Sequence, residues 1–280
     1  MAKPFKFPGR VTVCLCSGLL CFFSLPSGFL AQNSSIAPRD PNAVALAGQA
    51  LQALAGVTAL RDITLEANAT YIAGSDEEMG AATLVALGNQ QSLVTLNLTN
   101  GQRVEVRSGT NGGWTGPDGT QYAMALHNCW VEADWFFPAL TLQALQTDPT
   151  LGVAYLGAAE WNGAGVIHLQ FFHIIPGQTA FMTAQIQGLS TWDLYLDPQS
   201  LLPLALDYNT HPGNNLAKNI PMEIQFAGYS AVGGVQVPSR IQRFEQGTLA
   251  LDLAVSQAKV NSGVAPSTFT IATLPTGGAQ

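Results

Sequence analysis

The sequence predicts a mainly β fold with a few helices: a curled antiparallel sheet, or half-barrel, of roughly nine to eleven strands. A helical pattern follows residue 40, and alternating apolar and polar runs separated by short turns fill most of the remaining chain. Residues 121–146 interrupt this pattern with an aromatic insert. Consecutive hairpins form a meander that curls or closes to protect its edges. We therefore expect an N-terminal helix, the curled sheet and a helical insert that covers it as a lid.

The first 31 residues have the order of a secretory signal peptide. Lys3, Lys6 and Arg10 precede an apolar run over residues 11–25, which small and turn-forming residues follow. That run is shorter than the roughly 20 apolar residues of a membrane-spanning helix. We predict a signal peptide at 1–31, cleaved after Ala31 or at a site nearer Gly28, and a single β domain at 32–280 with no integral membrane span after cleavage.

The cysteines indicate the compartment. Three of the 4 cysteines lie in the predicted signal peptide, which leaves Cys129 with no second cysteine for a disulfide. Small secreted eukaryotic domains usually depend on disulfides, whereas a chain of this length can bury enough surface without them. We therefore predict an exported protein of the bacterial periplasm.

Charge excludes one class of partner. All 18 acidic residues lie after residue 31, together with 8 of the 11 basic ones. Nucleic-acid binding needs clustered Lys and Arg, so we expect no nucleic-acid partner. Charged residues make up 10% of the chain, where about a quarter is usual. Either the protein has a large apolar interior surface such as a ligand groove, or its outer surface uses uncharged polar residues.

The N-terminal helix is expected over residues 41–55. Asp40 is a good N-cap, Pro41 suits the first helical position and Gly56 ends the pattern. The residues predicted to share its apolar face are Val44, Ala47, Leu51 and Leu54.

After this helix the apolar period changes to two, which is typical of strands with one buried face. Residues 63–71 alternate in this way, and residues 94–98 and 104–106 flank the turn Asn100-Gly101. Asn-Gly between alternating runs is a strong hairpin signal. Later turns are predicted at Asn162-Gly163, Asp197-Pro198 and Gly233-Gly234.

The insert at about 121–146 has the spacing of one or two short helices broken at Pro138. So many large apolar side chains cannot remain in water, so they must lie against the sheet, either as a lid over a ligand groove or as ordinary core. The candidate ligand-binding residues are Trp130, Trp135, Phe136, Phe137, Leu140 and Leu142.

Several turn sequences resemble those of the LolA/LolB-like superfamily of periplasmic lipoprotein carriers. They are Leu-Tyr-Leu-Asp-Pro at 194–198, Leu-Pro at 202–203, Gly-Gly-Val-Gln-Val-Pro at 233–238 and Val-Asn at 260–261, with Phe269 behind. The resemblance implies a curled antiparallel sheet around an apolar groove covered by helices. It also implies binding of a lipid or a lipoprotein acyl chain. These residues also have structural roles, because the Asp197 side chain can hydrogen-bond to the backbone of its own turn and paired glycines supply positive φ.

Metal and catalytic signals are weak. His168 and His173 are five residues apart on one predicted strand, so their side chains should point to opposite faces. His127 and Cys129 supply fewer ligands than the three or four that zinc requires, and a lone thiol among apolar residues is usually an inert core residue. No nucleophile elbow, phosphate loop or dinucleotide fingerprint is present. We predict no metal site, no cofactor and no enzymatic activity.

Two smaller features have simple structural interpretations. The acidic run Asp76-Glu77-Glu78 is interpreted as a solvated hairpin tip. Trp114 could stack on a sugar or a base, but packing on the helix or sheet is the preferred interpretation.

We favour a carrier or sensor that binds an apolar ligand, such as a lipid or acyl chain, in a concave sheet groove. The alternative is an interaction or structural protein that uses the same sheet to bind another envelope protein, and a hydrolase with a dispersed site is the third hypothesis. Small residues on the inner face favour a groove, and Ala67, Ala69 and Ala205 are expected there.

Overall fold

The computed structural model describes residues 38–131 and 133–270, which belong to one compact unit, Asn33–Gln280. The predicted signal peptide at 1–31 lies outside the described residues. Within the described ranges, no helix is long and apolar enough to cross a membrane.

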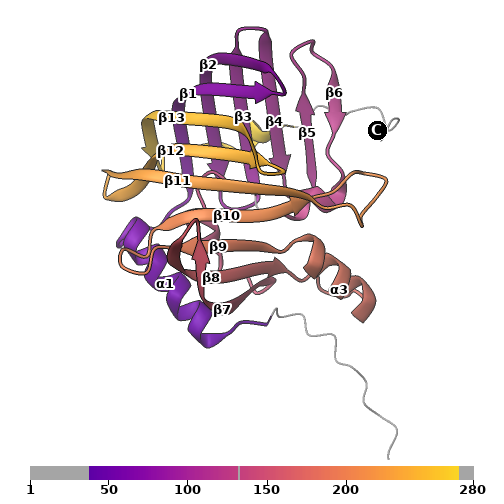
Figure 1. Cartoon of the computed structure of the whole chain (residues 1–280). Helices are drawn as coiled ribbons and strands as arrows, with labels where there is room; N and C mark the ends of the chain where they lie inside the picture. Colours follow the sequence, from indigo (N-terminus) through magenta and orange to yellow (C-terminus); the bar gives the residue numbers. More distant parts are fainter. Residues whose placement is uncertain (1–37, 132, 271–280) are drawn as a thin grey trace, which may run out of the picture. The chain divides into compact units, whose positions relative to one another are not determined.

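In the described ranges, thirteen strands form one antiparallel sheet whose order is β6-β5-β4-β3-β2-β1-β13-β12-β11-β10-β9-β8-β7. The pairing of β1 with β13 joins the first and last described strands, while β6 and β7 occupy the two edges. The sheet is thus open and curled, as predicted (Figure 1). The strands are β1 Asp62–Ala73, β2 Asp76–Leu87, β3 Gln91–Leu98, β4 Gly101–Ser108, β5 Asn111–Thr115, β6 Gln121–Ala123, β7 Leu151–Trp161, β8 Ala164–His173, β9 Trp192–Leu196, β10 Pro203–Thr210, β11 Ile220–Val232, β12 Val235–Glu245 and β13 Thr248–Val260.

The sheet has more strands than the roughly nine to eleven expected. Apolar alternation did not indicate β2, β5 or β6. Strand β2 begins with three acidic residues, β5 contains two glycines and β6 has only 3 residues. Their pairing with neighbouring strands, rather than their own pattern, makes them strands.

Helix α1 (Pro41–Ala55) has the predicted bounds. The Asp40 carboxylate accepts a hydrogen bond from the Asn42 N–H, and Gly56 ends the helix at φ +58°. Val44, which was expected on the buried face, is 39% exposed. The buried face instead carries alanines, which let the helix pack closely against β7, β12 and helix α2 (Ala139–Ala144).

Hairpins form at the predicted turns. At Asn100-Gly101 the position differs by one residue, because Gly101 begins β4 and the loop is formed by Thr99 and Asn100. Asn162 and Gly163 both have positive φ, as do Gly233 and Gly234. Two positive φ values in succession are what a two-residue hairpin loop of type I′ requires. At the β9–β10 turn, the Asp197 carboxylate accepts hydrogen bonds from the backbone of the residues that follow.

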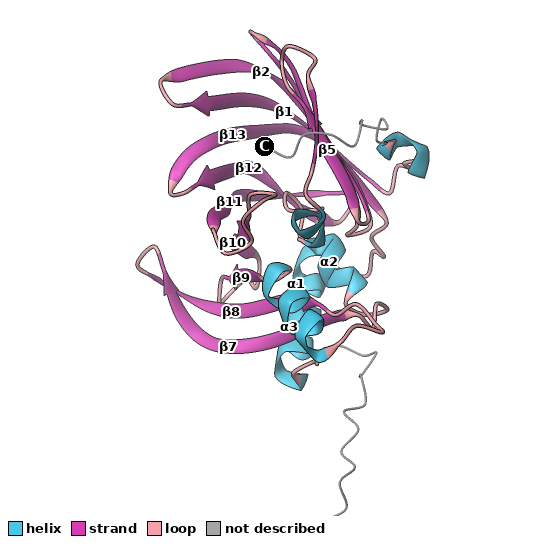
Figure 2. Ribbon diagram, turned by 90° about the vertical axis from the view of Figure 1, so that its right-hand side faces the viewer, coloured by secondary structure: helices cyan, strands magenta, loops and turns pink. Residues whose placement is uncertain are grey.

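The insert begins with β6 and continues as a short 3₁₀ helix, η1 (Leu126–Trp130), and α2. Pro138 lies directly before α2, and the buried Asp134 carboxylate accepts hydrogen bonds from the N–H and hydroxyl of Thr141. Helices α1 and α2 lie on the open side of the curled sheet (Figure 2). Two further elements, α3 (Ala180–Leu189) and the 3₁₀ helix η2 (Pro266–Phe269), complete the described chain.

The main core lies on the concave face of the sheet. Register places Ala67 and Ala69 on this face, opposite Val255 and Leu253. Ala205 is on the other face, opposite Tyr195 and outside this core, so its predicted position was wrong. Alternation shows which residues share a face within a strand, but not how two distant strands are aligned.

Candidate functional site

Five of the six candidate residues of the insert lie in the main core. Trp135, Phe136, Phe137, Leu140 and Leu142 are at most 2% exposed and belong to the same hydrophobic cluster as the concave face. Trp130 is separate from these five. It is half-buried and lines a small cavity of about 160 Å³ with Cys129 and Ile174.

A larger cavity opens on the concave face, beside this packed region. Its volume is about 340 Å³. The apolar and aromatic part of its wall comes from Tyr71, Val94, Leu96, Trp114 and Leu251. We call it the concave cavity.

Strand register brings the polar part of this wall together. Arg103 lies opposite Leu96, and Glu105 lies between Val94 and Trp114. On the other side of the curl, Arg243 lies opposite Leu251. All of these positions alternate with outward-facing residues, so residues far apart in sequence share one concave surface.

Arg103 is held in place by two contacts. Its Nη1 and Nη2 donate to the two carboxylate oxygens of Glu78, at 3.1 and 2.6 Å, and its guanidinium lies 4.5 Å from the centre of the Tyr71 ring. The hydrogen bonds from Arg103 hold the pKa of Glu78 below its usual range. Glu78 is only 6% exposed, so its interpretation as part of a solvated tip was wrong, whereas Asp76 and Glu77 are exposed.

Glu105 lies between two arginines. Its carboxylate is 3.1 Å from Arg107 Nε and 3.6 Å from Arg243 Nη1. Burial opposes the ionisation of Glu105, but the charges of Arg107 and Arg243 outweigh it and hold the pKa of this carboxyl below its usual range. The Arg243 guanidinium also lies over the Trp135 ring, 5.3 Å from its centre. Arg243 therefore connects the concave cavity to the buried aromatic insert.

Trp114 is the most accessible large ring of the cavity wall. It is 46% exposed and stacks on Tyr122 of the neighbouring strand, with ring centroids 3.9 Å apart. The expected packing on the sheet is confirmed, and the same ring also faces the concave cavity. The glycine-rich β5 around it gave no strand signal that would have indicated this role.

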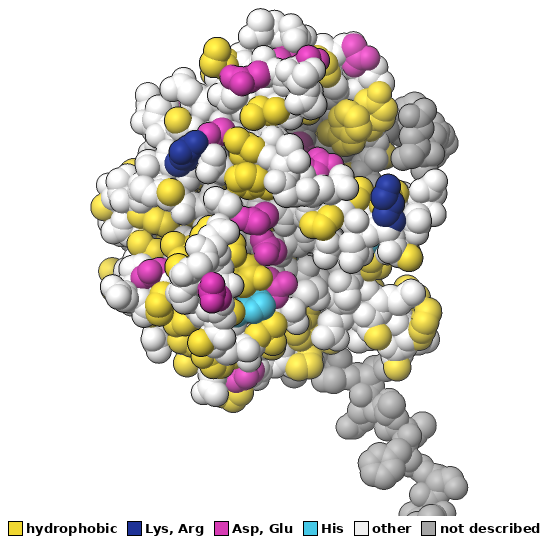
Figure 3. Space-filling model, viewed as in Figure 1, with side chains coloured by type: hydrophobic (Ala, Val, Ile, Leu, Met, Phe, Trp, Pro, Cys, Tyr) yellow, Lys and Arg dark blue, Asp and Glu magenta, His cyan; other side chains and the backbone are white. Residues whose placement is uncertain are grey.

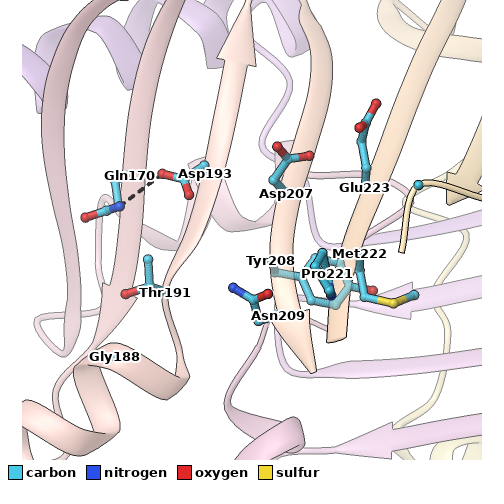
Figure 4. Close-up of a pocket in the computed structure, with 11 residues that line it drawn as sticks. Gln170, Gly188, Thr191, Asp193, Asp207, Tyr208, Asn209, Pro221, Met222 and Glu223 are labelled. Atoms are coloured by element: carbon cyan, nitrogen blue, oxygen red, sulfur yellow. Dashed lines mark hydrogen bonds between the residues drawn. The ribbon is translucent and has the colours of Figure 1, made fainter. Parts of the chain in front are cut away.

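The outer face carries a second, acidic groove of about 520 Å³ (Figure 4). Its carboxylates Asp193, Asp207 and Glu223 come from the neighbouring strands β9, β10 and β11. Acidic side chains also gather over the middle of this face in the space-filling view (Figure 3). Burial, and then the charges of Glu223 and Asp193, raise the pKa of Asp207 to about 7.

His168 and Gln170 both contact the same oxygen of Asp193, at 2.8 and 3.0 Å. They therefore share the outer face, as alternation predicts. His173 instead lines the small cavity beside Trp130. The two histidines do not come together.

Cys129 is buried and its Sγ donates to the Ala125 carbonyl oxygen. Burial raises the pKa of this thiol, which favours its inert form. His127 Nε2 lies 3.2 Å from the His211 carbonyl oxygen. Across the part of the chain that the structure describes, no group of three His, Cys, Asp or Glu side chains could hold a metal ion.

No protein-family model matches this chain, and no curated protein matches it in sequence. A solved structure shares its fold. A LolA superfamily protein from Nitrosomonas europaea is 13% identical, with a TM-score of 0.51, and the match covers 82% of this chain and 97% of that one. A DUF1329 family protein from Desulfovibrio piger is 11% identical, with a TM-score of 0.49 and coverage of 84% and 98%. The similarity to the LolA superfamily predicted from the turn sequences is thus confirmed at the level of the fold.

Proposed function

We propose that this chain is an exported protein that binds an apolar ligand, such as a lipid or an acyl chain, in the concave cavity. The ligand would be carried between membranes or sensed there. The observation that carries the proposal is the concave cavity itself, a space of about 340 Å³ on an otherwise packed concave face.

The composition of the cavity supports this proposal. Ligand sites are usually concave, mostly apolar and roughly 300–1,000 Å³ in volume, with a few polar groups that orient the ligand. Val94, Leu96 and Leu251 supply apolar wall, and Tyr71 and Trp114 supply aromatic wall. An acyl chain that enters removes this apolar surface from water, which is the main source of affinity for such ligands.

The insert has a second role in the proposal. Its buried side chains cover the concave face next to the cavity, and Arg243 contacts both regions. A ligand longer than the cavity would have to displace this cover. The side chains that we propose to contact such a ligand are those predicted from the sequence, Trp130, Trp135, Phe136, Phe137, Leu140 and Leu142.

A fluorescent fatty-acid probe tests the binding proposal on the chain that begins at Gln32. We expect saturable binding, and we expect Trp114→Ala to weaken it. Phe181→Ala is the matched control, because Phe181 is an exposed ring on α3 that does not line the cavity. Absence of probe binding by the unmodified chain, or equal loss in both variants, would contradict the proposal.

Export has its own test. When the full chain is expressed in a bacterium with a periplasm, we expect the processed protein in the periplasmic fraction, with its N-terminus near Gln32. N-terminal sequencing of the protein in that fraction shows both that it was exported and where it was cleaved. Recovery of the unprocessed chain in the cytoplasm would contradict export without bearing on ligand binding.

A further inference from the structure

We infer that the apolar ligand carries an anionic group, a carboxylate or a phosphate, and that this group binds Arg243 in the concave cavity. The inference rests on the proposed function and names the class of ligand for that same cavity.

The first step concerns charge. The cavity wall contains two arginines, Arg103 and Arg243, and one carboxylate, Glu105. Their ion-pair partners Glu78 and Arg107 bring the network to three positive and two negative groups. The chain as a whole has a net charge of −7. The concave cavity is thus a positive region in a negative protein, and charge complementarity favours an anion there.

The second step compares the three arginines. Arg103 makes two hydrogen bonds to its own carboxylate, Glu78. Arg107 donates to Glu105 and to the carbonyl oxygens of Asn128 and Val131. Both guanidinium groups therefore have hydrogen-bonded partners within the protein.

Arg243 differs from both. Its ion pair with Glu105 spans 3.6 Å, which is longer than a hydrogen bond, and Glu105 is already bonded to Arg107. Its Nε is buried and has no hydrogen-bond partner. A buried donor without a partner is unfavourable. The Arg243 side chain is 19% exposed and its Nη1 makes only the long ion pair with Glu105, so the accessible end of the guanidinium retains capacity to bind a further acceptor.

The chemistry of arginine selects the ligand group. A guanidinium presents a planar fork of donors that matches the two oxygens of a carboxylate or phosphate. Arg243 lies directly opposite Leu251, and both side chains line the cavity. An amphipathic anion can thus place its head group at Arg243 and its chain along the apolar wall. Glu245 follows on the same strand, but it is exposed and does not line the cavity.

Three ligands with the same twelve-carbon chain test the inference: dodecanoate, dodecyl phosphate and dodecanol. Displacement of the fluorescent probe at neutral pH and low salt measures their affinities. We expect at least one anion to bind about tenfold more tightly than the neutral alcohol, as for a hydrogen bond to a charged group. The stronger of the two anions identifies the head group as carboxylate or phosphate.

Arg243→Gln should remove this preference while the affinity for dodecanol stays near that of the unmodified chain. The matched control is Arg240→Gln, because Arg240 is on the same strand but is exposed and paired with Asp252. If Arg243→Gln does not fold, Arg243→Lys keeps the charge without the planar fork and should reduce the preference.

The outcomes separate the two proposals. Equal affinity of the unmodified chain for the alcohol and both anions would overturn the inference but leave apolar binding intact. An anion preference that persists in Arg243→Gln would also overturn it. Failure of all three ligands to bind would contradict the proposed function itself.

Discussion

Asp207 on β10 lies directly opposite Asp193 on the neighbouring strand β9. Asp207 also lies directly opposite Glu223 on β11, its neighbour on the other side. Like charges in opposite positions on a sheet repel each other. Burial, Glu223 and Asp193 together raise the pKa of Asp207 to about 7. The outer face therefore contains a carboxyl group that is easier to protonate in the folded protein than in the unfolded chain.

We expect the free energy of unfolding to fall as the pH rises from about 4 to about 7. In this window the folded protein keeps the Asp207 proton that the unfolded chain has released. The contribution of Asp207 to the free energy of unfolding is complete at the acidic end of this window, and it is lost once the carboxyl ionises in the folded protein. Because the Asp207 carboxyl is partly exposed, solvent screening limits this loss in the free energy of unfolding to on the order of 2 kcal/mol.

Urea unfolding at several pH values measures this effect. Asp207→Asn should remove most of the decrease between these pH values. Asp76→Asn should leave it unchanged, because Asp76 is exposed at the β1–β2 hairpin. A decrease of the same size in Asp207→Asn and in the unmodified chain would refute the assignment.

The Glu78–Arg103 ion pair should contribute measurably to stability. Glu78→Gln leaves the Arg103 guanidinium without its bidentate partner, so we expect the free energy of unfolding to fall by more than it does for a substitution at an exposed carboxylate. The neighbouring Glu77→Gln is the control, since Glu77 is exposed. Chemical denaturation at neutral pH gives both values, and equal effects at the two positions would contradict the pairing.

Phe136 should behave as a core residue in the absence of ligand. Its side chain is 0% exposed and lies edge-on to Trp135, with ring centroids 5.4 Å apart. Phe136→Ala should therefore cost about 3 to 5 kcal/mol in free energy of unfolding. Phe181→Ala, at a ring that is 68% exposed, should cost much less. A small effect at Phe136 would indicate a cover that is held loosely against the sheet.

Gly80 should tolerate no side chain. A Cβ at this position in β2 would overlap the backbone carbonyl of Asn97 in β3, so the two strands would have to separate. We expect Gly80→Ala to cost about 4 kcal/mol or more, or to prevent folding. Gly165→Ala in β8 is the control, because nothing lies within 4 Å of a Cβ there. Circular dichroism with thermal unfolding distinguishes the two variants.

Features that depend on neighbours in sequence could be predicted. The bounds of α1 follow from Asp40, Pro41 and Gly56, and the hairpin turns follow from residues that accept positive φ. Helix α3 was missed although Thr179 caps it, because Ile186 is its only buried residue and the helix therefore has little apolar periodicity.

The class of fold, the first helix and the hairpins could be predicted from the amino-acid sequence alone, because each of these depends on interactions within a few residues. Three features depend on how distant strands come together: Ala205 lies on the outer face, Glu78 is buried and Arg243 lies over Trp135. Alternation assigns side chains to two faces of a strand but does not show which face is covered or which distant strand lies alongside. The concave cavity draws its wall from β1, β3, β4, β5, β12 and β13, so its composition depends on the register of the whole curled sheet.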